Sequence, residues 1–129
     1  MIVDTSALIA ILYAEEGAEQ YASALAAAEH RLMSAGSYLE TGIVVDRQRG
    51  AAAGRQFDSL VVRAGIVIEP VTREQADIAR QAYLDFGKGI HPAGLNFGDC
   101  FSYALAKSMG MPLLFKGNDF TLTDITPAI

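Results

Sequence analysis

The sequence predicts an α/β fold whose mainly parallel sheet of about four to five strands is covered by helices on both faces. Short, almost wholly apolar runs alternate with longer segments in which apolar residues recur at helical spacing. Runs that are apolar throughout are typical of strands buried on both faces, as in parallel sheets. The chain has 129 residues, of which 51% are hydrophobic and 19% charged. Such a length and composition predict a single domain over 1–129 with one well-filled core.

The first quarter of the chain predicts two strands and two helices. Met1 to Val3 is expected to be a buried strand that leads directly into a helix, because Asp4, Thr5 and Ser6 are residues that commonly begin helices. A second helix is expected from about Glu16 to Glu29, and a short strand over Arg31 to Ser34.

The middle of the chain predicts further helices and one strand. Ser37 and Glu40 have the spacing of a capping box, which predicts the start of a helix. Gly50 and Gly54 interrupt the helical stretch that follows. Ile66 to Ile68 is β-branched throughout and is bounded by glycine and proline, so it is expected to be a strand.

The last part of the chain predicts two helices and up to two strands. Thr72 is expected to begin a helix, with Gln75 as its capping partner. A second helix is expected to begin at Asn96 and to end near Gly110. The run 113–115 is predicted to be a buried strand, and 123–125 a short final one.

Four carboxylates are expected at one edge of this sheet. Asp4 ends the first strand, and Asp119 closely follows the strand at 113–115. Glu40 and Asp99 are placed in the first turns of two helices that start near the same edge. Sites in open α/β sheets form beyond the carboxyl ends of the strands. Each acid alone has an ordinary structural explanation as a cap or turn residue, but four at one edge indicate a shared site.

Clustered carboxylates repel one another, and a hard divalent cation relieves the repulsion because Mg²⁺ and Mn²⁺ prefer oxygen ligands. Ten Lys and Arg against fifteen Asp and Glu give a net charge of -5. This charge excludes a protein that binds polyanions over its whole surface. Binding to a nucleic acid would need a local basic patch or metal ions.

The single cysteine, Cys100, excludes a disulfide scaffold and a Cys-rich zinc site and fits a reducing compartment. It has no matched histidine, so it is predicted to be a buried apolar residue rather than a nucleophile. No apolar run is long enough to cross a bilayer, and the first four residues do not resemble a signal peptide. A cytoplasmic location without membrane contact is therefore expected.

Four segments together resemble the PIN-domain ribonucleases, and among them the VapC-type toxins of bacterial toxin–antitoxin pairs. They are Asp4-Thr5-Ser6-Ala7-Leu8, Ser37-Tyr38-Leu39-Glu40, Asn96-Phe97-Gly98-Asp99-Cys100, and Gly117-Asn118-Asp119-Phe120 with Thr123-Asp124-Ile125. The order of the acids, above all the stretch 89–101, is more specific than the Asp-Thr-Ser start. The resemblance spans nearly the whole chain. It implies a PIN-like three-layer sandwich and an endoribonuclease that depends on Mg²⁺ or Mn²⁺. It also implies a cognate antitoxin that blocks the active site, and a homodimer that forms a higher assembly with the antitoxin.

By position, the family's four acids fall on Asp4, Glu40, Asp99 and Asp119. Asp4 and Asp99 are expected to hold the principal metal ion, and Glu40 and Asp119 to act through water or to admit a second ion. The expected supporting residues are Thr5, Ser6, Asn96 and Asp124, the last of which could replace or support Asp119. The candidates for RNA phosphate contacts are Lys88, His91 and Lys116.

Aromatic side chains near these acids are predicted to belong to the core rather than to stack on bases; they are Tyr38, Phe97, Phe101 and Tyr103. Apolar surface on the helices around 16–29 and 48–60 would support the homodimer.

Two other functions fit an acidic α/β domain of this length. A phosphoacceptor receiver domain also has a carboxylate at the end of its first strand, but it normally needs an adjacent acid pair where this chain has Asp4 and Thr5. A non-catalytic interaction module would keep the fold and use the acids structurally.

Overall fold

The computed structural model describes residues 1–129, and its centre is a four-stranded sheet in the order β3-β2-β1-β4. The strands are β1 (Ile2–Val3), β2 (Leu32–Ser34), β3 (Val67–Glu69) and β4 (Leu113–Leu114), and every neighbouring pair is parallel. The helices are α1 (Thr5–Leu12), α2 (Ala18–Ala27), α3 (Ala35–Arg49), α4 (Ala51–Arg63), α5 (Arg73–Phe86) and α6 (Phe97–Met109). The predicted α/β class is confirmed.

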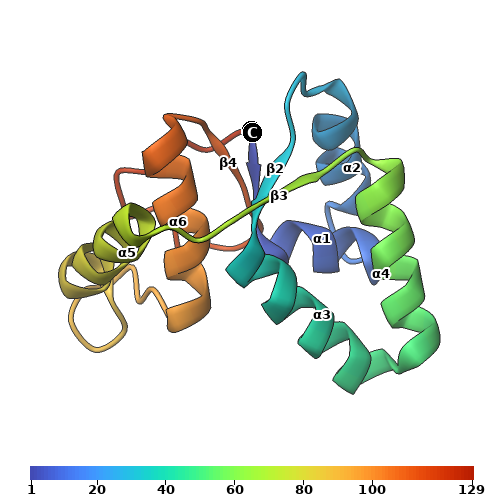
Figure 1. The fold of residues 1–129 in the computed structure, drawn as a ribbon, viewed down its shortest axis with the longest axis horizontal. Coiled ribbons are helices and arrows are strands. Elements are labelled where there is room, and N and C mark those ends of the chain that lie inside the picture. The colour runs from blue at the N-terminus through green and yellow to red at the C-terminus, as the bar shows by residue number, and fades with distance from the viewer.

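The sheet is the middle layer of three (Figure 1), with α5 and α6 on one side and α1 to α4 on the other. Successive strand residues point to opposite faces. In β1, Ile2 belongs to the apolar cluster under α5 and α6, and Val3 belongs to the cluster under α1 to α4. Leu113 and Leu114 divide between the same two clusters. This two-sided burial is the reason that the strands are apolar throughout.

The strand order places a natural site beside β1. The chain moves from β1 outward to β2 and β3, and then returns past β1 to form β4 on its other side. Such a reversal is the point at which parallel sheets leave a crevice beyond the strand ends. Helix α3 follows β2 directly, and α6 leads back into β4, so both helices have their first turns at this edge.

The predicted capping box at Ser37 and Glu40 is wrong. Helix α3 begins three residues earlier, where the Ser34 side chain caps it by accepting the backbone N–H of Gly36 at 3.2 Å. Ser37 is consequently fully buried within the first turn, and Glu40 lies in the second turn rather than the first. The strand β2 ends at the cap itself, leaving no linker between strand and helix.

The cap of α5 and the end of the chain also differ in detail from the sequence prediction. Thr72 does cap α5, but the Gln75 side chain donates to the carbonyl of Pro70 instead of returning to the cap. The short strand expected at 123–125 is absent, because Thr123 forms a turn by donating to the Phe120 carbonyl at 2.7 Å.

None of the helices combines the length and apolar character that a bilayer crossing requires.

Candidate active site

Asp4 lies at the end of β1, caps α1 and is only 4% exposed. Its Oδ2 accepts the backbone N–H of Ser6 at 3.0 Å and the Ser6 hydroxyl at 2.6 Å. Its Oδ1 accepts the hydroxyl of Ser102, which comes from α6, at 2.5 Å. A buried carboxylate needs such donors because an uncompensated charge would be costly. These bonds fix the orientation of the Asp4 carboxylate.

Glu40 is half-buried on α3 and faces Asp4. Its Oε1 accepts the Thr5 hydroxyl at 3.0 Å. A Cβ built on Gly98 would overlap the Glu40 carboxylate, so this carboxylate lies directly against the start of α6. Burial is the main factor raising the pKa of Glu40; the Thr5 hydroxyl opposes the rise and the Asp4 charge adds to it.

Asp99 occupies the first turn of α6, as predicted. It shares a capping box with Asn96, in which the Asn96 side chain accepts the Asp99 N–H at 2.8 Å and Asp99 accepts the Asn96 N–H at 3.0 Å. The pKa of Asp99 is raised to about 7, mainly by burial, although the hydrogen bond from the Asn96 N–H lowers it. The charges of Asp4 and Asp119, and a hydrogen bond to Asp119, raise it further.

The structure therefore gathers all four acids at one sheet edge. Asp4 acts electrostatically on both Glu40 and Asp99, and Asp119 acts on Asp99. The acids are neighbours without forming a closed chelate, since no three His, Cys, Asp or Glu side chains are arranged to hold an ion as they stand. Like charges favour such an open arrangement, and Asp4, Glu40 and Asp99 are held by hydroxyl or amide donors instead.

The expected supporting residues divide into two groups. Ser6 holds Asp4, Thr5 holds Glu40, and Asn96 holds Asp99. Asp124 is not brought to this cluster. Its carboxylate accepts the Tyr103 hydroxyl at 2.6 Å and pairs with Lys107 at 2.8 Å, which ties the last turn segment to α6.

The expected phosphate contacts are placed unevenly. Lys116 donates its backbone N–H to the Ser6 hydroxyl at 2.9 Å, while its ammonium group pairs with Glu15 at 3.0 Å. His91 accepts the Ala93 N–H through Nδ1 at 3.0 Å, which stabilises its own loop. Lys88 is exposed in the same loop.

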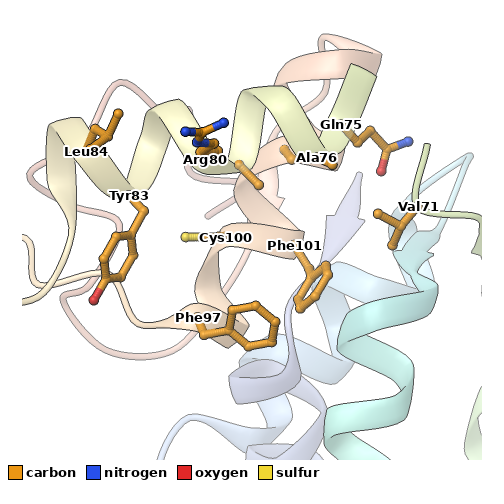
Figure 2. A pocket seen from close by; sticks show the side chains of 11 residues that line it. Val71, Gln75, Ala76, Arg80, Tyr83, Leu84, Phe97, Cys100 and Phe101 are labelled. Carbon is orange, nitrogen blue, oxygen red and sulfur yellow. The ribbon is translucent and has the colours of Figure 1, made fainter. Parts of the chain in front are cut away.

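An apolar groove of about 450 Å³ runs between α5 and α6 (Figure 2). Tyr83 and Leu84 line it from α5, and Phe97 and Phe101 line it from α6. Phe97 is 78% exposed, so its predicted place in the core is wrong. We call this surface the α5–α6 groove. Cys100 also lines it, and burial, with a smaller effect of the Asp99 charge, raises the pKa of its thiol to about 11, which excludes an activated nucleophile.

The helices whose apolar surface would support a homodimer expose little of it. Helix α2 has no large apolar side chain among the exposed residues, and α4 has only Val62. Exposed apolar side chains are found instead in the α5–α6 groove and at Leu39 and Ile43 on α3.

The buried hydroxyls around Asp4 were not predicted from the sequence as part of the site. Ser102 lies one turn after Asp99 on an otherwise apolar stretch of α6, and Ser37 lies opposite on α3. Both are fully buried, with their oxygens 3.1 Å apart. A serine in an apolar helix face, one turn from a predicted ligand, is the signal that could have identified Ser102.

Comparison with known proteins identifies a family over most of the chain. The PIN domain model matches residues 1–125. Ribonuclease VapC28 of Mycobacterium tuberculosis is 58% identical over 130 residues, covering 100% of this chain and 98% of its own. Ribonuclease VapC of Mycolicibacterium smegmatis is 54% identical, covering 97% of each chain.

Solved structures share the fold at low sequence identity. The M. tuberculosis toxin VapC20, described as cleaving the sarcin-ricin loop, has a TM-score of 0.79 at 18% identity, covering 97% of this chain and 95% of its own. A toxin–antitoxin complex from Klebsiella pneumoniae has a TM-score of 0.70 at 15% identity, covering 95% and 92%.

Proposed function

The chain belongs to the PIN-domain family, and we propose that it is the endoribonuclease toxin of a toxin–antitoxin pair. It hydrolyses RNA phosphodiester bonds at the cluster of Asp4, Glu40, Asp99 and Asp119. The observation that carries the proposal is the convergence of these acids beyond the ends of β1 and β4. The full-length similarity to ribonucleases of the VapC type supports the same activity.

The donor chemistry of the cluster fits a hard divalent cation, Mg²⁺ or Mn²⁺. All four side chains offer carboxylate oxygens, which these ions prefer over nitrogen or sulfur. The raised pKa of Asp99 reflects burial and like charge, both of which a cation would offset. Asp4 and Asp99 would hold the principal ion, and Glu40 and Asp119 would act through water or admit a second one. When bound, such an ion activates a water and neutralises charge on the phosphate oxygens.

The chain's own residues orient these acids. Ser6 and Ser102 hold Asp4 through both carboxylate oxygens, and Thr5 holds Glu40. The capping box with Asn96 fixes Asp99 at the start of α6. Positioning the ligands before substrate arrives avoids reorganisation at the moment of reaction.

An acidic protein must still attract RNA. Lys88 is exposed in the loop before α6 and is our candidate for a phosphate contact. Lys116 would first have to release Glu15, and their exposure of 33% and 38% allows this exchange. His91 we assign to the structure of its loop, because its Nδ1 already accepts the Ala93 N–H.

We expect two protein partners, a cognate antitoxin and a second copy of the chain. The α5–α6 groove is the surface we assign to the homodimer, since a monomer has little reason to expose Phe97, Leu84 and Tyr83 together. An antitoxin would cover the acids and join the dimers into a higher assembly. Leu84→Glu should shift the sedimentation coefficient from dimer to monomer at micromolar concentration, and a wild-type monomer would refute the homodimer.

The decisive test is RNA cleavage by the purified protein. Cleavage should stop with EDTA and return with Mg²⁺ or Mn²⁺. Asp4→Asn should abolish it with the fold intact by circular dichroism, while Asp58→Asn on the exposed face of α4 should leave it unchanged. A folded Asp4→Asn protein that still cleaves RNA would favour a non-catalytic role for the acids.

A further inference from the structure

We propose that Ser102, supported by Ser37, is a positioning residue that determines which oxygen of Asp4 is offered to a divalent cation. The inference rests on the proposed function, because it concerns the same carboxylate cluster. It goes beyond the four acids by giving a role to two hydroxyls that are buried from solvent.

The hydrogen atoms of the two hydroxyls have only one consistent arrangement while Asp4 is ionised. A carboxylate only accepts hydrogen bonds, so the single hydrogen of Ser102 goes to Asp4 Oδ1 at 2.5 Å. The bond of 3.1 Å between Ser37 and Ser102 must then be donated by Ser37. Both serines are fully buried, so water does not compete for these bonds. The result is a directed chain from Ser37 through Ser102 to Asp4.

The same count identifies the free acceptor position on Asp4. A carboxylate has about four lone-pair positions, two on each oxygen. Oδ2 accepts twice from Ser6, through its backbone N–H and its hydroxyl. Oδ1 accepts only from Ser102, so its second lone pair is the one left for a ligand. The Ser102 bond therefore orients the oxygen that would bind the ion.

The close approach of α3 and α6 makes this chain possible. A Cβ on Gly36 would overlap the ring of Phe101, so only glycine permits the two helices to lie this close. Gly36 and Phe101 each precede one of the two serines in sequence. The helix contact thus brings Ser37 and Ser102 within hydrogen-bond distance across the interface.

Mn²⁺ binding measured by calorimetry on the full chain without RNA separates this role from simple packing. Ser102→Ala should weaken Mn²⁺ binding about tenfold or more, as is usual when a group orienting a metal ligand is lost. Ser37→Ala should weaken it by a smaller factor, because Ser102 keeps its bond to Asp4 but loses the donor that polarises it. The double variant should match Ser102→Ala, since Ser37 acts only through Ser102.

Ser34→Ala is the matched control. Ser34 is 1% exposed and caps α3, so the variant also removes a buried hydroxyl, but one whose hydrogen bond goes to Gly36 and not to Asp4. Its Mn²⁺ affinity should stay within about twofold of the wild type. A merely structural role for Ser102 would lower the melting temperature of both variants and leave both affinities unchanged.

A folded Ser102→Ala protein that binds Mn²⁺ like the wild type would overturn the inference. If circular dichroism shows that Ser102→Ala does not fold, Ser37→Ala decides, and an unchanged affinity there would also overturn it. A wild-type protein that binds no Mn²⁺ would instead refute the proposed function, and the inference with it.

Discussion

Replacing Asp99 with asparagine should stabilise the metal-free protein at pH 8 while abolishing RNA cleavage. Burial raises the pKa of Asp99 to about 7, and the charges of Asp4 and Asp119 contribute to the rise. Between its unfolded value of 3.8 and about 7, the folded chain keeps a proton on Asp99 that the unfolded chain has lost. Stability from this group is therefore fully present below pH 3.8, declines as the pH rises toward 7, and remains lost above it.

The magnitude follows from the same two pKa values. Each pH unit in this window corresponds to about 1.4 kcal/mol, which gives about 4 kcal/mol as an upper limit. Asp99 keeps partial contact with solvent, and a neutral amide accepts the Asn96 N–H less strongly than a carboxylate does. We therefore expect the free energy of unfolding of Asp99→Asn to exceed that of the wild type by about 2 kcal/mol at pH 8. This difference should shrink toward pH 4.

Urea denaturation followed by circular dichroism in EDTA measures this difference at pH 5 and pH 8. Asp58→Asn on the exposed face of α4 is the control, and it should follow the wild type at both pH values. An Asp99→Asn protein that is less stable than the wild type at pH 8, or whose difference from it does not depend on pH, would refute the reasoning.

Two further substitutions test other parts of the structure. Gly98→Ala should push the flexible Glu40 carboxylate out of place without harming the helix, so cleavage should fall about tenfold or more while the melting temperature changes little. A melting temperature that falls together with activity would contradict this. Asp124→Ala should cost about 1 to 2 kcal/mol in urea denaturation, because the buried Tyr103 hydroxyl loses its acceptor. Cleavage per folded molecule should not change, and a loss of cleavage would show that Asp124 acts in the active site.

Much of the architecture could be predicted because local signals and the fold agree. The apolar runs became strands, and Asn96 and Gly110 mark the ends of α6 as their capping preferences predict. The start of α3 was missed because two serines three residues apart compete for the cap. Local sequence favours Ser37, but Ser34 stands where β2 ends, and Ser37 is drawn into the interface with α6.

The parts of the site that could not be predicted depend on partners distant in sequence. Asp124 and Asp119 lie in the same turn-rich segment, so the sequence alone does not separate their roles. In the folded chain Asp124 contacts Tyr103 and Lys107, which gives it a structural role. Phe97 has the spacing of a core residue, yet it faces the α5–α6 groove because α5 does not cover the first turn of α6. Periodicity identifies an apolar face but not whether another element covers it.

The uneven distribution of donors among the acids indicates where a cation would change stability most. Asp4 accepts three hydrogen bonds and is therefore compensated within the protein itself. Asp99 accepts one backbone N–H while the charges of Asp4 and Asp119 act on it. Asp99 is thus the acid on which two like charges act, whereas only the Asp4 charge acts on Glu40. A cation that binds there relieves the repulsion between Asp99 and its acidic neighbours, so Mn²⁺ should raise the melting temperature of the wild type more at pH 8 than at pH 5.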